Sequence, residues 1–196
     1  MVSLSLGIGG FLLYLLYDIN SFTCRSRLLH TAFALGTLLI GAATALDVWE
    51  AWRLGAFSGP GDAALLLAAA ACLAALVYSL FFALPFQETY REQAEERRVY
   101  DGGVYALCRH PGILCFFGVY LCLGLAALPG DLLVHGMMFS LLNLAYAGFQ
   151  DRITFPRTFC DYEAYRKRAP FLIPTGDSIR LARQTWGRSV SEEEEP

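Results

Sequence analysis

Charged residues are scarce in this chain of 196 residues, and their scarcity excludes an ordinary soluble domain. Asp, Glu, Lys and Arg make up 17% of the residues, whereas hydrophobic residues make up 56%, and the mean hydropathy is +0.43. A typical soluble domain is about 25% charged and about 45–50% apolar. The apolar residues are also gathered into long runs, which indicates a lipid environment rather than the core of a soluble protein.

The sequence also lacks the cysteine and glycine patterns of metal, disulfide and nucleotide sites. None of the six cysteines forms a CxxC pair, and without ligand spacing their residue type favours packing roles over metal or disulfide roles. Gly7-Ile8-Gly9-Gly10 lies inside an apolar run with no strand before it, so it is not a phosphate-binding loop. We expect neither a metal nor a nucleic-acid partner.

Five segments contain no Asp, Glu, Lys or Arg: residues 2–17, 28–46, 63–87, 111–130 and 132–150. A helix needs about 20 apolar residues to cross the hydrocarbon layer, and the second to fifth segments meet or approach that length. The first segment lacks the basic start and the small-residue cleavage site of a signal peptide, so we interpret it as a further span. These segments predict an all-α, polytopic membrane protein with about five transmembrane helices.

The few positive charges are distributed unevenly about these spans. With five spans, 14 of the 15 Lys and Arg residues fall on one side, and only Arg53 falls on the other. Lys and Arg concentrate on the cytoplasmic side of membrane proteins. The distribution predicts an N-terminus outside and a C-terminus in the cytoplasm.

A short connection brings two separated polar stretches to the same membrane face. The last two spans are joined by Pro129-Gly130-Asp131 alone, which predicts an antiparallel helix hairpin. Asp151 would then return beside Arg109 and His110. Pro111 suits the first turn of a helix, so Arg109 and His110 would lie at a helix N-terminus, which favours a bound carboxylate.

The chain divides by composition into three parts. Residues 1–87 are predicted to form a membrane scaffold of three helices, and residues 88–175 to form the functional region with the hairpin. Within that region, residues 88–101 are charged and predicted to be helical, followed by a turn at Gly102-Gly103. Residues 176–196 end in a run of glutamates and are predicted to be a flexible tail.

Four short patterns in the second half of the chain have the spacing of a known family. They are Gly103-x-Tyr105, Arg109-His110-Pro111, Tyr162-x-x-Tyr165 and Arg168-x-Pro170. With the hairpin between them, over roughly residues 88–175, they resemble the integral-membrane methyltransferases. That family includes isoprenylcysteine carboxyl methyltransferases and phospholipid N-methyltransferases. The family usually has Tyr and Gly where this chain has Ile113 and Cys115.

The resemblance implies an S-adenosyl-L-methionine pocket at the cytoplasmic end of the hairpin. It assigns cofactor binding to Tyr105, Arg109, His110, Pro111, Asp151 and Tyr162, and catalytic roles to Arg109 and Arg168. A lipophilic methyl acceptor would enter from the membrane lipid. Prenylcysteine carboxylates, phospholipid amines and small hydrophobic molecules all suit such an entrance.

The chemistry of methyl transfer suits this set of residues. Transfer from a sulfonium is an in-line displacement, which needs positioning and a dry site but no nucleophilic triad. Arg109 and Arg168 are suited to carboxylates of the cofactor or the acceptor. Asp151 is suited to the ammonium or the ribose hydroxyls, and His110 to a hydrogen bond with the cofactor.

Two other interpretations remain open. The first is a membrane NAD(P)H-dependent reductase of the sterol type, although its dinucleotide phosphates would require more polar residues. The second is a non-catalytic membrane protein that keeps the scaffold. In that case Arg109 and Arg168 would be ordinary interfacial charges.

Overall fold

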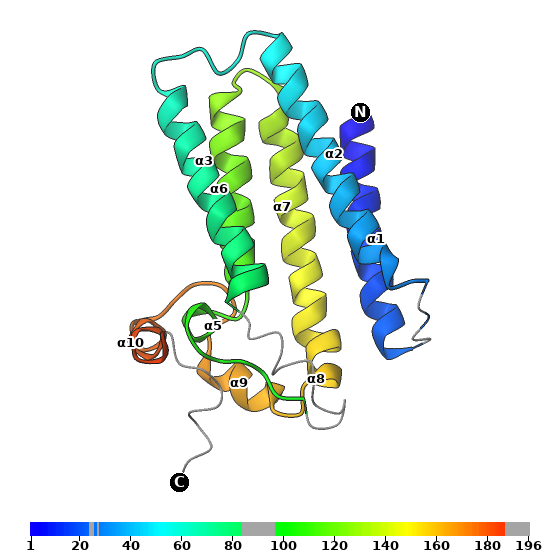
Figure 1. The fold of residues 1–196 in the computed structure, drawn as a ribbon, viewed down its shortest axis with the longest axis vertical. Helices are drawn as coiled ribbons and strands as arrows, with labels where there is room; N and C mark the ends of the chain where they lie inside the picture. The colour runs from blue at the N-terminus through cyan, green and yellow to red at the C-terminus, as the bar shows by residue number, and fades with distance from the viewer. Residues whose placement is uncertain (24–25, 27, 84–96, 187–196) are drawn as a thin grey trace. The chain divides into compact units, whose positions relative to one another are not determined.

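The computed structural model describes residues 1–23, 26, 28–83 and 97–186. Every regular element within these residues is a helix (Figure 1). In chain order they are α1 (Val2–Phe22), α2 (Thr31–Arg53), α3 (Asp62–Val77), the π-helix η1 (Tyr78–Phe82), α5 (Val104–Leu107), α6 (Pro111–Ala126), α7 (Asp131–Phe149), the π-helix η2 (Gln150–Thr154), α8 (Phe155–Thr158), α9 (Tyr162–Arg168) and α10 (Gly176–Thr185).

Four of the helical segments are long and apolar enough to cross a membrane. They are Val2–Phe22, Thr31–Arg53, Asp62–Phe82 and Asp131–Thr158. The remaining predicted span is the apolar helix α6, which has only 16 residues and is shorter than the roughly 20 that cross a bilayer at right angles. The predicted class, an all-α polytopic membrane protein, is confirmed.

The chain folds into two compact units, each made of two separate stretches. The first unit comprises Met1–Leu73 and Phe116–Gln150, and the second comprises Ala74–Cys115 and Asp151–Pro196. Chain segments that lie far apart in the sequence therefore meet within each unit.

The first unit contains the hairpin that the sequence predicts. Helix α6 ends at Ala126, and α7 begins at Asp131, so the chain reverses within four residues and the two helices run side by side (Figure 1). A Cβ atom at Gly124 would meet Leu133 backbone at 2.6 Å, and one at Gly136 would meet Tyr120. The hairpin closes tightly because glycine stands at both contacts.

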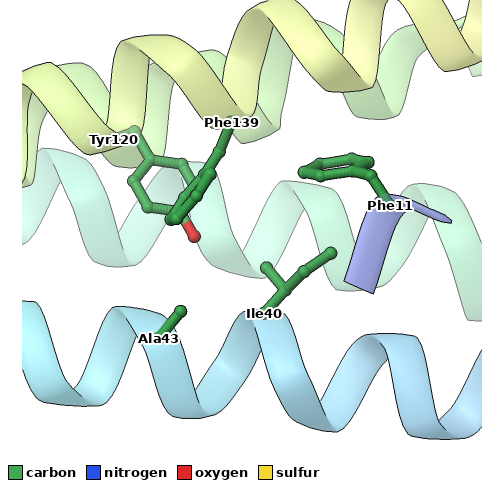
Figure 2. Close-up of a cluster of buried hydrophobic side chains, with 5 residues drawn as sticks. All are labelled: Phe11, Ile40, Ala43, Tyr120 and Phe139. Atoms are coloured by element: carbon green, nitrogen blue, oxygen red, sulfur yellow. The ribbon is translucent and has the colours of Figure 1, made fainter. Parts of the chain in front are cut away.

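The core of this unit is a small aromatic and aliphatic cluster contributed by four helices. Phe11, Ile40, Ala43, Tyr120 and Phe139 are buried against one another (Figure 2). The Tyr120 ring meets Phe139 edge to face, with ring centroids 5.7 Å apart, which is a favoured aromatic geometry. The cluster joins α1 and α2 to the hairpin.

Helices α1 and α2 approach each other through paired glycines. A Cβ atom at Gly10 would lie 2.8 Å from the Gly36 carbonyl oxygen, and one at Gly36 would lie 2.8 Å from the Gly10 carbonyl oxygen. Helices in membranes gain little from hydrophobic burial, so close backbone contact supplies much of their association. The small residues in the first two spans therefore form a packing surface.

Helix α2 continues beyond the charge-free run, which ends at Leu46. Asp47, which directly follows that run, lies inside the helix, and its carboxylate is 3.0 Å from His135 Nδ1. Ser3 Oγ is 3.3 Å from the same nitrogen. His135 from α7 gives the Asp47 carboxylate a polar partner, and the helix continues to Arg53.

The second unit differs from the sequence prediction at its two ends. Residues 97–101 are not helical, and the rest of the predicted charged helix, residues 88–96, lies outside the described residues.

The predicted tail instead begins with the helix α10. Its first turn is closed by a capping box, in which Thr175 Oγ1 accepts from the Ser178 amide and Ser178 Oγ accepts from the Thr175 amide. Such a cap stabilises even a short helix.

We predict that Gly36→Ala loosens the contact between α1 and α2. The added methyl would lie 2.8 Å from a backbone oxygen, and overpacking of this kind costs about 1–3 kcal/mol. Thermal melting in detergent measures the loss. Gly41→Ala, in the same helix, is the matched control, because no described atom lies within 4 Å of its new methyl. Equal destabilisation by both substitutions would contradict the glycine contact.

Candidate functional site

The candidate site is built where the two stretches of the second unit meet. Arg109 and His110 directly precede Pro111, the first residue of α6. Asp151 lies in η2, directly after α7. Pro156 has no amide hydrogen for the Arg152 carbonyl, and the chain before it widens into a π-helix, a form that is often found at functional sites.

A buried ion pair joins Arg109 to Asp151. Arg109 Nε lies 2.8 Å from Asp151 Oδ1, and Arg109 Nη2 donates to Oδ2 at 3.3 Å. Both side chains are more than nine-tenths buried. A planar guanidinium matches a carboxylate with two parallel contacts, so the pair is held in one geometry. The prediction that the hairpin returns Asp151 to Arg109 is confirmed.

The rest of the Arg109 guanidinium holds the end of α9. Its Nη1 donates to the carbonyls of Arg166 at 2.8 Å and Ala169 at 2.9 Å. The last carbonyls of a helix have no partner within the helix, and Arg109 supplies one for them. The guanidinium also lies over the Phe171 ring, 5.6 Å from its centroid. Three of the five N–H groups of this arginine are thus engaged in hydrogen bonds, and Nε contacts Asp151 as an ion pair without a hydrogen bond.

Asp151 accepts further donors at both oxygens. The Tyr162 hydroxyl donates to Oδ1 at 2.7 Å, and Arg166 Nε lies 3.7 Å from Oδ2. Burial and the neighbouring Asp151 carboxylate raise the pKa of the Tyr162 hydroxyl, so the hydroxyl keeps its proton and remains a donor. A carboxylate with this many donors remains ionised in an apolar setting.

The His110 imidazole is buried between aromatic rings. It stacks on Phe155 with centroids 5.8 Å apart and an angle of 16°, and it meets Phe171 edge to face at 4.9 Å. Its Nε2 lies 3.7 Å from Asp151 Oδ1, which is too far for a hydrogen bond. This nitrogen therefore has no hydrogen-bond partner among the described residues.

Tyr105 contributes to the frame of the site rather than to its polar centre. Its hydroxyl donates to the Ser79 carbonyl at 2.7 Å, and its own carbonyl accepts from the Tyr165 hydroxyl at 2.8 Å. These bonds fasten α5 between η1 and α9. Gly103 begins α5 with φ of +56°, a conformation that favours glycine, as the predicted turn at this position requires.

Arg168, like Tyr105, is a predicted site residue that lies apart from the polar centre. It is half exposed, and its Nη2 lies 2.8 Å from Asp101 Oδ2. Arg166, two residues earlier, reaches Asp151 in its place. Residues two apart on a helix point in different directions, which explains why the two arginines have different partners.

Sequence reasoning missed three kinds of contact at this site. It did not single out Arg166, and it did not place the rings of Phe155 and Phe171 around His110. It also missed the carbonyls at the end of α9. The aromatic residues that alternate with basic residues after Asp151 were the available signal, but their partners depend on where the short helices α8 and α9 end.

The described residues of this site can bind and position a ligand, and none of them is an activated nucleophile. The Cys108 thiol, next to Arg109, is fully buried, and burial raises its pKa to about 11, so it remains an unreactive thiol. Among the described residues of the site, His110 Nε2 and Arg109 Nε have no hydrogen-bond partner, and the Arg166 side chain is 40% exposed. Cationic and neutral donors of this kind recognise an anionic or polar ligand.

No protein-family model, no curated protein and no solved structure matches this chain.

We predict that Arg109→Met destabilises the second unit strongly. It would leave the buried Asp151 carboxylate without its main partner, and breaking a buried pair costs about 3–5 kcal/mol. Adding Asp151→Asn to Arg109→Met should recover part of the loss, because the amide is neutral. Thermal melting in detergent tests both variants.

The matched control for this variant is Arg180→Met. Arg180 pairs with Asp177 at 3.5 Å on the surface of α10, where an ion pair contributes about 0–1 kcal/mol. Equal losses for Arg109→Met and Arg180→Met would contradict the structural role given to the buried pair.

We also predict that Cys108 resists alkylation in the folded protein while Cys160 reacts. Cys160 is exposed, whereas Cys108 is buried and has a thiol pKa of about 11. Only the thiolate is nucleophilic, so raising the pH from neutral to mildly alkaline should leave Cys108 almost unmodified. Peptide mass analysis after treatment with iodoacetamide measures this, and unfolded protein is the control. Comparable labelling of both residues in folded protein would argue against the buried position.

Proposed function

We propose that this chain is an integral-membrane methyltransferase that uses S-adenosyl-L-methionine and acts on a lipophilic acceptor. One observation carries the proposal. Arg109, His110, Asp151 and Tyr162, four positions that the family resemblance assigns to the cofactor, form one contiguous polar cluster at the start of α6. They come from segments 42 and 53 residues apart, so their meeting is not a consequence of local sequence.

The donors at the cluster fit the polar groups of such a cofactor. His110 Nε2 is buried and has no hydrogen bond within the described residues, and a buried polar nitrogen of this kind favours a ligand partner. Arg166 lies 3.7 Å from the other oxygen of Asp151, its side chain is 40% exposed, and it is suited to the amino-acid carboxylate of the cofactor. When bound, the cofactor would supply a methyl group on a sulfonium, ready for in-line displacement.

In this proposal Arg109, Asp151 and Tyr162 chiefly position the ligand-binding groups. Arg109 and Asp151 hold each other and the end of α9, and so fix the backbone that carries Arg166. The Tyr162 hydroxyl donates a hydrogen bond to Asp151 Oδ1 and so helps to hold this carboxylate in place. The rings of Phe155 and Phe171 keep water from His110, and transfer from a sulfonium requires that protection from water.

Arg168 is the proposed contact for the acceptor. Its ion pair with Asp101 lies at the surface, where such pairs contribute about 0–1 kcal/mol, so an acceptor could displace Asp101 at little cost. An acceptor with a carboxylate suits this arginine best. The excess of Lys and Arg on one side of the spans supports a cytoplasmic position for the site and an N-terminus outside.

A thermal-shift experiment with two matched arginines tests the cofactor. Arg166 and Arg180 each pair with an acidic residue three positions earlier, but only Arg166 reaches Asp151. S-adenosylhomocysteine at 100 times its Kd should stabilise the full chain in detergent by about 2.7 kcal/mol. Arg166→Ala and His110→Ala should each remove that shift, whereas Arg180→Ala should retain it.

Other results of this thermal-shift experiment would favour the alternative functions. A shift with NADPH but not with S-adenosylhomocysteine would replace the methyltransferase by a reductase. If neither ligand shifts the melting of well-folded protein, the cluster is structural and the chain is a non-catalytic scaffold. If the thermal shift persists in both Arg166→Ala and His110→Ala, the cofactor binds somewhere other than this cluster.

A further inference from the structure

Helix α10 has one face that packs and one that does not. Ser178 and Ala182 are buried, and the helix packs against α5. The Gly103 amide donates to Thr185 Oγ1 at 3.1 Å, which fastens the end of the helix to the start of α5. Because α5 directly precedes α6, this contact holds α10 close to the first turn of an apolar helix.

The uncovered side of α10 carries large apolar residues. Ile179 is 39% exposed and Trp186 is 60% exposed. Trp186 is the C-cap residue directly after α10 and follows Ile179 by seven positions, a spacing that places both on the same side of the helix. Within the described residues, the chain does not cover this apolar surface.

Basic residues border the same surface. Arg183 lies four residues after Ile179 and three before Trp186, and Arg180 follows Ile179 directly. Asp177 is the one acidic residue of the helix and is paired with Arg180. Apolar residues flanked by arginines on one side of a short amphipathic helix are typical of helices that lie in the membrane interface.

We propose that α10 docks on the surface of the bilayer, with Ile179 and Trp186 at the boundary between headgroups and acyl chains and with Arg180 and Arg183 at anionic lipid phosphates. Two observations favour a bilayer over a protein partner. Four of the described helices are long and apolar enough to cross a membrane, so a bilayer is the surface expected beside this helix. Arginines also have long stems that let the charge reach the headgroups while apolar neighbours lie deeper. This docking is independent of the proposed enzyme activity.

The only tryptophans are Trp49, Trp52 and Trp186, so fluorescence can report on α10 alone. Trp49→Phe with Trp52→Phe leaves Trp186 as the sole tryptophan of the full chain. The protein is reconstituted into phosphatidylcholine vesicles, with and without phosphatidylglycerol, whose acyl chains are brominated near the headgroup. Trp186 emission should fall on the order of twofold relative to unbrominated vesicles, as expected for a ring at the interface, and fall further with phosphatidylglycerol.

Two aspartate substitutions provide the matched comparison. Ile179→Asp places a charge on the apolar side and should abolish most of the quenching. Gln184→Asp places the same charge on a different side of α10 and should leave the quenching unchanged. Far-ultraviolet circular dichroism confirms that both variants remain folded.

Absence of quenching in both kinds of vesicle would overturn the proposal and leave a protein partner as the occupant of this face. Quenching that persists in Ile179→Asp would also overturn it, because Trp186 would then reach lipid by another route. Equal quenching with and without phosphatidylglycerol would overturn the role given to Arg180 and Arg183.

Discussion

The ion pair between Arg109 and Asp151 is the interaction on which the second unit depends. Its two residues are separated by the whole of α6 and α7, and burying both charges is costly unless each is fully compensated. The groups that compensate the two charges come from elsewhere in the unit. Arg109 takes the last carbonyls of α9, and Asp151 takes the hydroxyl of Tyr162 from the first turn of the same helix. Helix α9 is thus held at both ends by one pair.

A buried ion pair seldom adds much net stability, and its better-attested use is to specify one arrangement among several. That use suits a short helix such as α9, which has seven residues and little intrinsic stability. Tyr162 and Tyr165 are buried in one cluster with Ala169, and the polar contacts decide how that cluster is oriented. Burial of the apolar residues favours the packing of α9, while the ion pair fixes the position in which it packs.

The larger features of the fold could be predicted from the sequence because they follow from length and composition. The charge-free runs marked the spans, and the three residues 129–131 predicted the hairpin that returns Asp151 to Arg109. The first position of α6 followed from the missing amide of Pro111. Each of these inferences uses a rule that acts over a few residues or over one whole helix.

What the sequence did not predict depends on contacts between segments. The continuation of α2 through Asp47 could not be predicted, because the partner of Asp47, His135, is 88 residues away. Helix α10 looked like a tail because its stability comes from a cap and from packing on α5, not from a long periodic pattern. Arg168 seemed the better candidate than Arg166 because the spacing matched the family, but the direction of each side chain depends on where α9 begins.

The contacts also determine which of the charged residues can bind a ligand. The Arg109 guanidinium is poorly placed to be the main anchor of a ligand, because three of its five N–H groups already donate to Asp151 and to the end of α9. The neighbouring residues His110 and Arg166 are therefore better placed to bind a ligand. His110 is buried with an unsatisfied nitrogen, and Arg166 has an exposed edge beside the same carboxylate. If a ligand binds here, Arg109 acts through the backbone it holds, and His110 and Arg166 make the contacts.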